Sequence, residues 1–267
     1  GQTWPRIVFL DMPIEDRAVD TLVAVEKMVE HGVGGIIVLG GDGTHRLVAS
    51  RAGDVPITAL STGTNNVFPA MREATIAGLA AGLVAMGQVP VTAGAIRNKV
   101  LRIDVNGIET DLALVDLCTS TELWVGSRAL WRAEGLDQLF LSFAEADAIG
   151  LSSIGGLLRP VARAAEGGLW LNLADPATAP TVIAAPLAPG LMINIGIEEV
   201  HDLHPGEAIN LRAKRGVVAL DGERELEFSQ NDKLVVRLEW DGPLTLDISK
   251  VMIYAAENEL LKRKNAN

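Results

Sequence analysis

The sequence predicts an α/β plus β protein, in which an N-terminal α/β lobe is followed by a mainly antiparallel β-rich lobe. Three observations predict it. Short apolar runs alternate with segments of helical period up to about residue 93, and strand-like runs dominate after that point. Two tight-turn dipeptides, Asn106-Gly107 and Asp221-Gly222, separate strand-like runs in the second part. At 267 residues the chain is long enough for two modest domains.

The first part of the chain alternates strands and helices. An apolar strand is expected at Arg6 to Leu10, then a helix ended by Gly32, then a strand at Gly35 to Leu39. A third strand at Val55 to Leu60 and a helix at about Glu73 to Met86 follow. This order predicts a Rossmann-like lobe.

The second part reads as strands with little helix. Ile96 to Val105 and Ile108 to Leu117 flank the Asn106-Gly107 turn, and a helical stretch is expected near Ser127 to Ala144. We divide the chain into a nucleotide-binding lobe (1–93), a β-rich substrate and oligomerisation lobe (94–245), and a C-terminal segment that returns to the first lobe (246–267). Further strands are expected at about 169–173, 181–185, 191–197, 208–212, 217–220, 225–228 and 234–240.

Composition excludes several classes of function. The net charge of -11 and the pI near 4.9 argue against nucleic acid and anionic membrane surfaces as partners. The single cysteine, Cys118, rules out an intramolecular disulfide or a cysteine-based zinc cluster, and no apolar run is long enough to span a bilayer. The histidines His31, His201 and His204 have no metal-ligand spacing. We expect a soluble, cytoplasmic protein without a protein-held metal.

Two loops carry the chemistry that the sequence suggests. The apolar strand from Gly35 ends in Gly40-Gly41-Asp42-Gly43-Thr44, where missing side chains let the backbone approach a phosphate and a helix begins. The strand Ile57 to Leu60 ends in a second small, polar loop, Ser61-Thr62-Gly63-Thr64-Asn65-Asn66. Taken alone, the first loop is explained equally well as a tight turn, but two such loops at adjacent strand ends are suited to one polyphosphate.

These residues resemble a known superfamily. Gly40 to Thr44 matches the GGDGT signature of NAD kinases and of diacylglycerol and sphingosine kinases, and the second loop resembles their Gly-Thr-Asn loop. Gly150 to Gly156 and Pro186 to Pro189 are similar to later NAD kinase motifs, so the resemblance covers nearly the whole chain. The sequence Gly-Thr-Asn-Asn-Val-Phe-Pro at residues 63–69 and the insertion at residues 125–131 resemble the acetoin-catabolism protein X (AcoX) branch most.

The resemblance implies a kinase with the two-domain NAD kinase-like fold, which transfers the γ-phosphoryl group of ATP to a hydroxyl. NAD is the leading acceptor, which implies NADP biosynthesis, and Mg²⁺ arrives on the substrate phosphates. Relatives assemble through the β-rich half, so a homodimer or homotetramer is expected. The resemblance implies Asp42 as the catalytic carboxylate; Gly40, Gly41, Gly43, Thr44, Thr64, Asn65 and Asn66 as nucleotide-binding residues; and Asp116, Ser152 and Ser153 as substrate-binding residues.

The sequence also departs from the pattern of the superfamily. Val115-Asp116 stands where NAD kinases have an Asn-Glu pair, and His45-Arg46 stands where lipid kinases have Asn-Glu. The earlier strand with its Asn-Pro turn is missing, so the chain reads as a truncated or naturally short form. These departures keep two alternatives open: a lipid or polyol kinase, and an accessory protein that binds ATP or NAD without turnover.

Two single residues have a structural and a functional interpretation. Glu223, after the Asp221-Gly222 turn, has a lipid-kinase counterpart that serves as general base, but we favour a plain turn between strands. His45 follows the first loop and is interpreted as a solvated side chain in the first turn of a helix.

Overall fold

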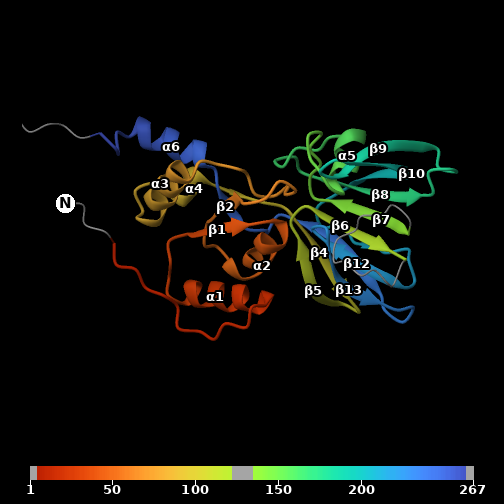
Figure 1. The fold of residues 1–267 in the computed structure, drawn as a ribbon, viewed down its shortest axis with the longest axis horizontal. Helices are drawn as coiled ribbons and strands as arrows, with labels where there is room; N and C mark the ends of the chain where they lie inside the picture. Colours follow the sequence, from red (N-terminus) through yellow and green to blue (C-terminus); the bar gives the residue numbers. More distant parts are fainter. Residues whose placement is uncertain (1–4, 122–134, 263–267) are drawn as a thin grey trace, which may run out of the picture.

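The computed structural model describes residues 5–121 and 135–262. Two lobes lie side by side (Figure 1), one carrying all the described helices except α5 and the other made almost entirely of strands. The predicted fold class is confirmed: an N-terminal α/β lobe with a largely parallel sheet is followed by antiparallel β-sheets.

The sheet of the first lobe draws strands from both ends of the chain. Its order is β1 (Ile36–Gly40), β2 (Ile57–Ser61), β15 (Leu244–Leu246) and β3 (Ala95–Arg97). β2 pairs in parallel with β1 and with β15, and β3 runs antiparallel to β15. β3 and most of β15 belong to residues 94–245, which the sequence assigns to the second lobe. The helices of this lobe are α1 (Ala18–Glu30), α2 (Asp42–Ala52), α3 (Ala74–Ala85), α4 (Val91–Gly94) and α6 (Ile248–Glu257).

The C-terminal helix packs on the first lobe. The carboxylate of Asp247 caps α6 by accepting from the backbone N–H of Lys250, and Glu73 caps α3 in the same way with the N–H groups of Thr75 and Ile76. Small residues on the buried face of α3 allow the helices to approach closely. One hydrophobic cluster joins the two helices through Ala80, Leu83, Val84, Val251 and Ala255.

The second lobe contains two antiparallel sheets around a shared core. Leu101, Phe140, Val218 and Val236 are fully buried in that core and come from strands of both sheets. The short helix α5 (Ser152–Leu158) lies against the larger sheet, beside β9. The larger sheet has the order β13 (Glu223–Phe228), β12 (Gly216–Leu220), β6 (Asp116–Ser120), β7 (Leu136–Leu141), β8 (Gly168–Ala174), β10 (Leu191–Leu203), β9 (Thr181–Ala188), and the smaller β11 (Ile209–Asn210), β14 (Leu234–Glu239), β4 (Val100–Val105), β5 (Ile108–Ala113).

Both predicted tight turns are present. Asn106 and Gly107 have φ of 55° and 81°, and Asp221 and Gly222 have φ of 50° and 79°. Two consecutive positive φ values are the requirement of the favoured two-residue hairpin turn, which Asn-Gly and Asp-Gly meet at low cost. The turns connect β4 to β5 and β12 to β13.

Three local predictions are wrong or incomplete. The strand expected at Arg6 to Leu10 does not form: this segment belongs to no sheet, and Phe9 is 89% exposed, because no strand lies beside the outer edge of β1 in the described structure. The helix expected near Ser127 to Ala144 is wrong over Leu136–Leu141, which is the buried strand β7 between β6 and β8; residues 127–134 lie outside the described residues. The strand expected at Ile108 to Leu117 breaks into β5 and β6.

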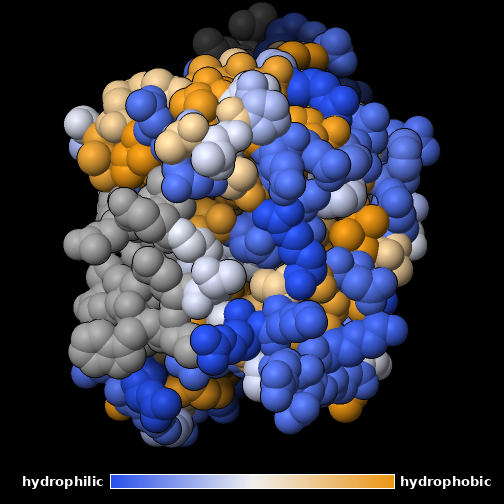
Figure 2. Space-filling view, turned by 90° about the vertical axis from the view of Figure 1, so that its right-hand side faces the viewer, coloured by the Kyte–Doolittle hydropathy of each residue, from blue (hydrophilic) through white to orange (hydrophobic). Residues whose placement is uncertain are grey.

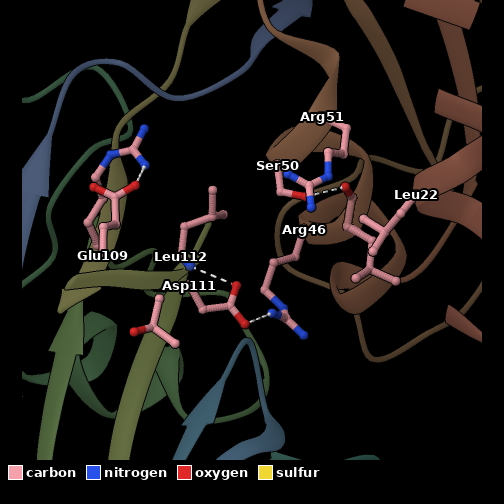
Figure 3. A pocket seen from close by; sticks show the side chains of 10 residues that line it. Leu22, Arg46, Ser50, Arg51, Glu109, Asp111 and Leu112 are labelled. Carbon is pink, nitrogen blue, oxygen red and sulfur yellow. Dashed lines mark hydrogen bonds and ion pairs between the residues drawn. The ribbon is translucent and has the colours of Figure 1, made fainter. Parts of the chain in front are cut away.

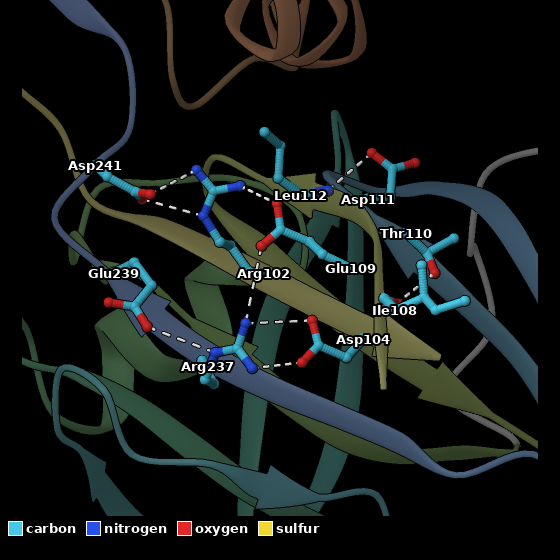
Figure 4. Close-up of polar contacts among 10 residues, drawn as sticks. All are labelled: Arg102, Asp104, Ile108, Glu109, Thr110, Asp111, Leu112, Arg237, Glu239 and Asp241. Carbon is cyan, nitrogen blue, oxygen red and sulfur yellow. Dashed lines mark hydrogen bonds and ion pairs between the residues drawn. The ribbon is translucent and has the colours of Figure 1, made fainter. Parts of the chain in front are cut away.

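The surface carries much of the charge of the protein. Figure 2 looks onto the β-rich end, where hydrophilic residues cover most of the face and hydrophobic residues gather at the upper left. On the smaller sheet of the second lobe, Arg102 pairs with Glu109 and Asp241, and Arg237 pairs with Asp104 (Figure 4). Among the helices that are described, none has the length and apolar character needed to cross a lipid bilayer.

Candidate functional site

The two polar loops meet at the carboxyl ends of β1 and β2. Gly40 and Ser61 are register partners at the ends of these parallel strands, and the N–H of Thr62 donates to the carbonyl of Gly40. A Cβ on Gly41 would lie 2.7 Å from Oδ1 of Asn66, so the two loops are in direct contact. The predicted adjacency of the loops is confirmed, and Gly41 is required by the close approach.

Asn66 closes the second loop on itself. Its Nδ2 donates to Oγ of Ser61 over 2.8 Å, and that hydroxyl donates to the carbonyl of Gly63 over 2.9 Å. Thr64 and Asn65 are exposed at the tip. The loop therefore has a fixed base and a polar tip that is open to a ligand.

Asp42 is the first residue of α2 and faces the second loop. Its Oδ1 accepts from the N–H of Phe68 at 2.8 Å, and its Oδ2 accepts from the N–H of Val67 at 2.9 Å. Burial raises the pKa of Asp42, whereas the two N–H donors and the charge of Arg163 lower it. The raised pKa makes the Asp42 carboxylate a stronger base than an exposed aspartate, which suits it to taking up a proton.

Arg163 holds the other side of the same loop from the β-rich lobe. Its Nη1 donates to the carbonyl of Phe68 at 2.9 Å, and its Nη2 donates to the carbonyl of Val67. Glu145 receives two hydrogen bonds from this guanidinium, each 3.0 Å long, and the ring of Phe143 lies under it at 4.3 Å. The segment Val67-Phe68 is thus held from both lobes.

Two further carboxylates surround the site from the second lobe. Asp116 begins β6 and is 5% exposed, and burial raises its pKa well above the ordinary range, with Asp221 and Asp42 raising it further. Burial, reinforced by Asp42, raises the pKa of Asp221 to about 7. The Asp221 carboxylate accepts from the N–H groups of Leu114, Val115 and Asp116, which explains why the chain leaves the β5 ladder there.

The Asp221-Gly222 turn has a second consequence. It places the carboxylate of Glu223 against the first loop, where a Cβ on Gly43 would lie 2.9 Å from Oε1. The turn interpretation is confirmed by the φ values, and the same turn brings Glu223 to the site.

The residues after the first loop are buried. The interpretation of His45 as solvated is wrong, because its side chain is fully buried and its Nδ1 lies 2.8 Å from the carbonyl of Gly41. Burial lowers its pKa, which favours the neutral ring. Arg46 is 4% exposed and donates to Asp111 of β5 across 2.8 Å, at the rim of a polar pocket of about 380 Å³ between the lobes (Figure 3).

Comparison with known proteins identifies the family of the chain. Residues 99–241 match the acetoin catabolism protein X C-terminal domain, and residues 7–89 match the ATP-NAD kinase N-terminal domain. Acetoin catabolism protein X of Cupriavidus necator is 45% identical over 262 residues, which cover 97% of this chain and 73% of that protein. The chain belongs to the acetoin catabolism protein X family.

Two solved structures are also similar, both at 12% identity. Yeast NADH kinase complexed with NADH gives a TM-score of 0.47 over 87% of this chain and 68% of that chain. The NAD kinase from Archaeoglobus fulgidus in complex with ATP gives 0.43 over 92% and 95%. The family assignment rests on the sequence matches.

The family signature residues do not all gather in one place. The structure brings Asp42, the two loops and Asp116 together. Ser152 and Ser153 are fully buried in α5, and their hydroxyls donate to the carbonyls of Ile149 and Gly150 in their own turn. None of the hydrogen bonds found in residues 5–121 and 135–262 joins them to the loops. Their role in substrate binding stays a prediction.

Sequence reasoning missed Arg163, Glu145 and the site role of Asp221. The Asp-Gly pattern predicts the turn at Asp221 but not the burial of its carboxylate. Nothing around Arg163 in the sequence marks it, since its partners lie 95 and 96 residues earlier in this family member.

Proposed function

We propose that this protein is an ATP-dependent kinase that transfers a phosphoryl group to a hydroxyl of a nucleotide acceptor, with NAD the leading candidate. One observation carries the proposal: the Asp42 carboxylate stands at the start of α2, between two glycine-containing loops, and two backbone N–H groups fix its direction. Membership of a family named for acetoin catabolism supports a role beside acetoin-degrading enzymes.

The residues of the loops fit a bound polyphosphate. The start of α2 offers backbone N–H groups, and Thr44, Thr64 and Asn65 offer side-chain donors around them. The pKa values of Asp116 and Asp221 are raised, which reduces the negative charge of these two nearby carboxyl groups beside a bound polyphosphate. Mg²⁺ carried by the ATP phosphates supplies the neutralising charge in such a transfer.

In the proposed reaction Asp42 accepts the proton of the acceptor hydroxyl. The hydroxyl oxygen forms a bond to the γ-phosphorus as the bond from that phosphorus to the β–γ bridging oxygen breaks, and ADP leaves with that oxygen. Because most of the catalysis in phosphoryl transfer comes from positioning, the fixed orientation of the Asp42 carboxylate is the feature that matters most.

A lipid or polyol acceptor is the second candidate. The contact of Glu223 with Gly43 favours it, since this carboxylate also reaches the first loop. A binding protein without turnover is the third candidate.

We further propose that the protein assembles through the β-rich lobe as a homodimer or homotetramer. Light scattering is the test, and a monomer at all concentrations would refute this proposal.

The test is formation of NADP from NAD and Mg-ATP by the wild type and by Asp42→Asn. An asparagine oxygen in the Oδ1 position still accepts from Phe68 and Val67, so we expect the variant to fold, with a modest loss of stability because its Nδ2 group faces the N–H of Val67. The variant has no basic oxygen for the proton. Product from the wild type alone supports the proposal. An active, folded variant removes Asp42 from the mechanism, and ATP binding without product in either protein moves the assignment to another acceptor or to a binding protein.

A further inference from the structure

Asp42 and Arg163 are joined through a single peptide unit. The carbonyl of Val67 accepts from Nη2 of Arg163, and the N–H of the same peptide, carried by Phe68, donates to Oδ1 of Asp42 at 2.8 Å. A guanidinium on the oxygen side polarises the peptide and strengthens its N–H as a donor to the carboxylate. The two charges thus act on opposite ends of one dipole.

The two flanking peptide units each add one contact. The N–H of Val67 donates to Oδ2 of Asp42 at 2.9 Å, and the carbonyl of Phe68 accepts from Nη1 of Arg163 at 2.9 Å. A planar guanidinium is suited to this task because its two Nη groups are held at a fixed spacing. A lysine has one nitrogen and cannot hold both carbonyls with the same geometry.

The guanidinium is itself fixed. Glu145 accepts from Nε and from Nη2 at 3.0 Å each, and Phe143 supports the face of the group. Phe143 belongs to the hydrophobic cluster that also buries Phe68. Arg163 and Glu145, which we call the clamp, and the Val67-Phe68 segment therefore pack against the same cluster. Arg163 is therefore held independently of Asp42.

We propose that Arg163 is a positioning residue for Asp42: acting through the Val67 and Phe68 peptides, it holds the carboxylate in one orientation, and Glu145 holds Arg163. The expected effect of Arg163 on catalysis rests on the proposed function. The clamp itself is a relation between the two lobes and is open to measurement without turnover.

The charge of Arg163 lowers the pKa of Asp42, whereas burial raises it. Burial raises the pKa of Asp42, Asp116 and Asp221, and the charge of Asp42 raises the pKa of the other two. Glu223 reaches Gly43 beside it, and His45 is neutral by burial. Among the causes of the Asp42 pKa, Arg163 is the cation that lowers it.

The direct test is the titration of the Asp42 carboxyl by NMR in ¹³C-aspartate protein, assigned with Asp42→Asn. In Arg163→Met we expect the Asp42 midpoint to rise by about half a pH unit or more, since it loses an opposite charge and the polarised N–H donor of Phe68. Arg163→Lys should restore part of the shift. Arg159→Met is the matched control, because Arg159 makes an exposed ion pair with Asp202 and should leave the midpoint unchanged.

Glu145→Gln keeps the Arg163 charge and loosens its support, and it serves if Arg163→Met does not fold. The lost carboxylate charge alone would lower the Asp42 midpoint, so a rise in Glu145→Gln reports the loosened Arg163, and we expect a rise smaller than that in Arg163→Met. An unmoved Asp42 midpoint in folded variants would overturn the inference, even where the unfolding temperature falls, because a merely structural arginine changes stability alone. If the wild type transfers no phosphoryl group while the midpoint moves, the kinase proposal fails and the clamp stands.

Where turnover is present, the acid limb of the kcat–pH profile supplies a second readout. Because kcat requires the ionised base, Arg163→Met should move that limb to higher pH, parallel to the NMR midpoint. A limb that stays in place while the midpoint moves would show that Asp42 is not the base.

Discussion

Arg46 of α2 donates a hydrogen bond from Nη1 to Oδ2 of Asp111 on β5 over 2.8 Å, and this ion pair joins the two lobes (Figure 3). The Arg46 side chain is 4% exposed and that of Asp111 is 27% exposed, so water screens the pair incompletely.

Asp111→Asn should destabilise the protein more than removal of an exposed pair. Loss of the carboxylate leaves the buried Arg46 charge with weaker compensation, and we expect a loss of about 1 to 3 kcal/mol in the free energy of unfolding, below the range of fully buried pairs because Asp111 is partly exposed. Arg51→Gln breaks the half-exposed pair with Glu26 and should cost less than about 1 kcal/mol. Urea unfolding compares the two, and equal losses would contradict the prediction.

Gly41→Ala should weaken ATP binding while leaving most of the fold intact. The added Cβ meets Oδ1 of Asn66 at 2.7 Å, so the second loop has to move away from the first. Gly78→Ala in α3 is the matched control, because a Cβ there meets nothing within 4 Å and should stabilise the helix by about 0.5 to 1 kcal/mol. Calorimetry with Mg-ATP measures the first effect, and unchanged affinity in Gly41→Ala would count against the loop as the phosphate site.

Asn66 and Asn65 should have separable effects. Asn66→Ala loses the hydrogen bond to Ser61 and should lower both nucleotide affinity and the free energy of unfolding, the latter by about 1 kcal/mol. Asn65→Ala changes an exposed tip residue and should lower affinity alone. Thermal unfolding beside ATP titration distinguishes them, and a loss of stability in Asn65→Ala would show that the tip is structural.

The stability of the protein should fall with rising pH where Asp221 titrates. The pKa of Asp221 in the folded protein is about 7, above the ordinary value of 3.8, so the unfolded chain holds fewer protons at this site between these values. The contribution of Asp221 is therefore greatest at low pH and is lost as pH rises from about 4 through 7. His45, whose pKa is lowered, acts in the opposite direction below pH 6.5.

A comparison of wild type and Asp221→Asn removes the contribution of His45, which both proteins contain, and reports Asp221 together with its effect on the pKa of Asp116. The difference in unfolding free energy should change across pH 4 to 7.5 with the wild type losing more. A difference that is flat with pH would mean that Asp221 stays ionised in the folded protein.

The sequence predicts the local features of the site better than its long-range contacts. The glycine loops, the strand ends that carry them and the two hairpin turns depend on residues that are adjacent in the chain, and all of them are present in the structure. Turn residues such as Asp221-Gly222 specify backbone conformation directly. The loop of Gly41 and that of Asn66 could be placed together because they follow parallel neighbours.

The missed features depend on partners that are far apart in sequence. Arg163 belongs to the site because it donates to the carbonyls of Val67 and Phe68, and Glu145 because it binds Arg163. No periodicity in the sequence indicates such contacts. β7 has a mixed apolar pattern that suits either a helix or a buried strand, and its two neighbours in the larger sheet decide between them. Arg6 to Leu10 is an apolar run that predicts a strand but forms none, because no strand of the described structure lies beside it.

The position of β15 between β2 and β3 has a consequence for the order of synthesis. The first lobe needs Leu244–Leu246 as an interior strand and α6 as a cover for α3, so it cannot be completed while those residues are still inside the ribosome. The β-rich residues emerge before the first lobe is finished. A nascent chain stalled before residue 244 should therefore expose the inner edge of β2 to chaperones, and emergence of β15 and α6 should end that exposure.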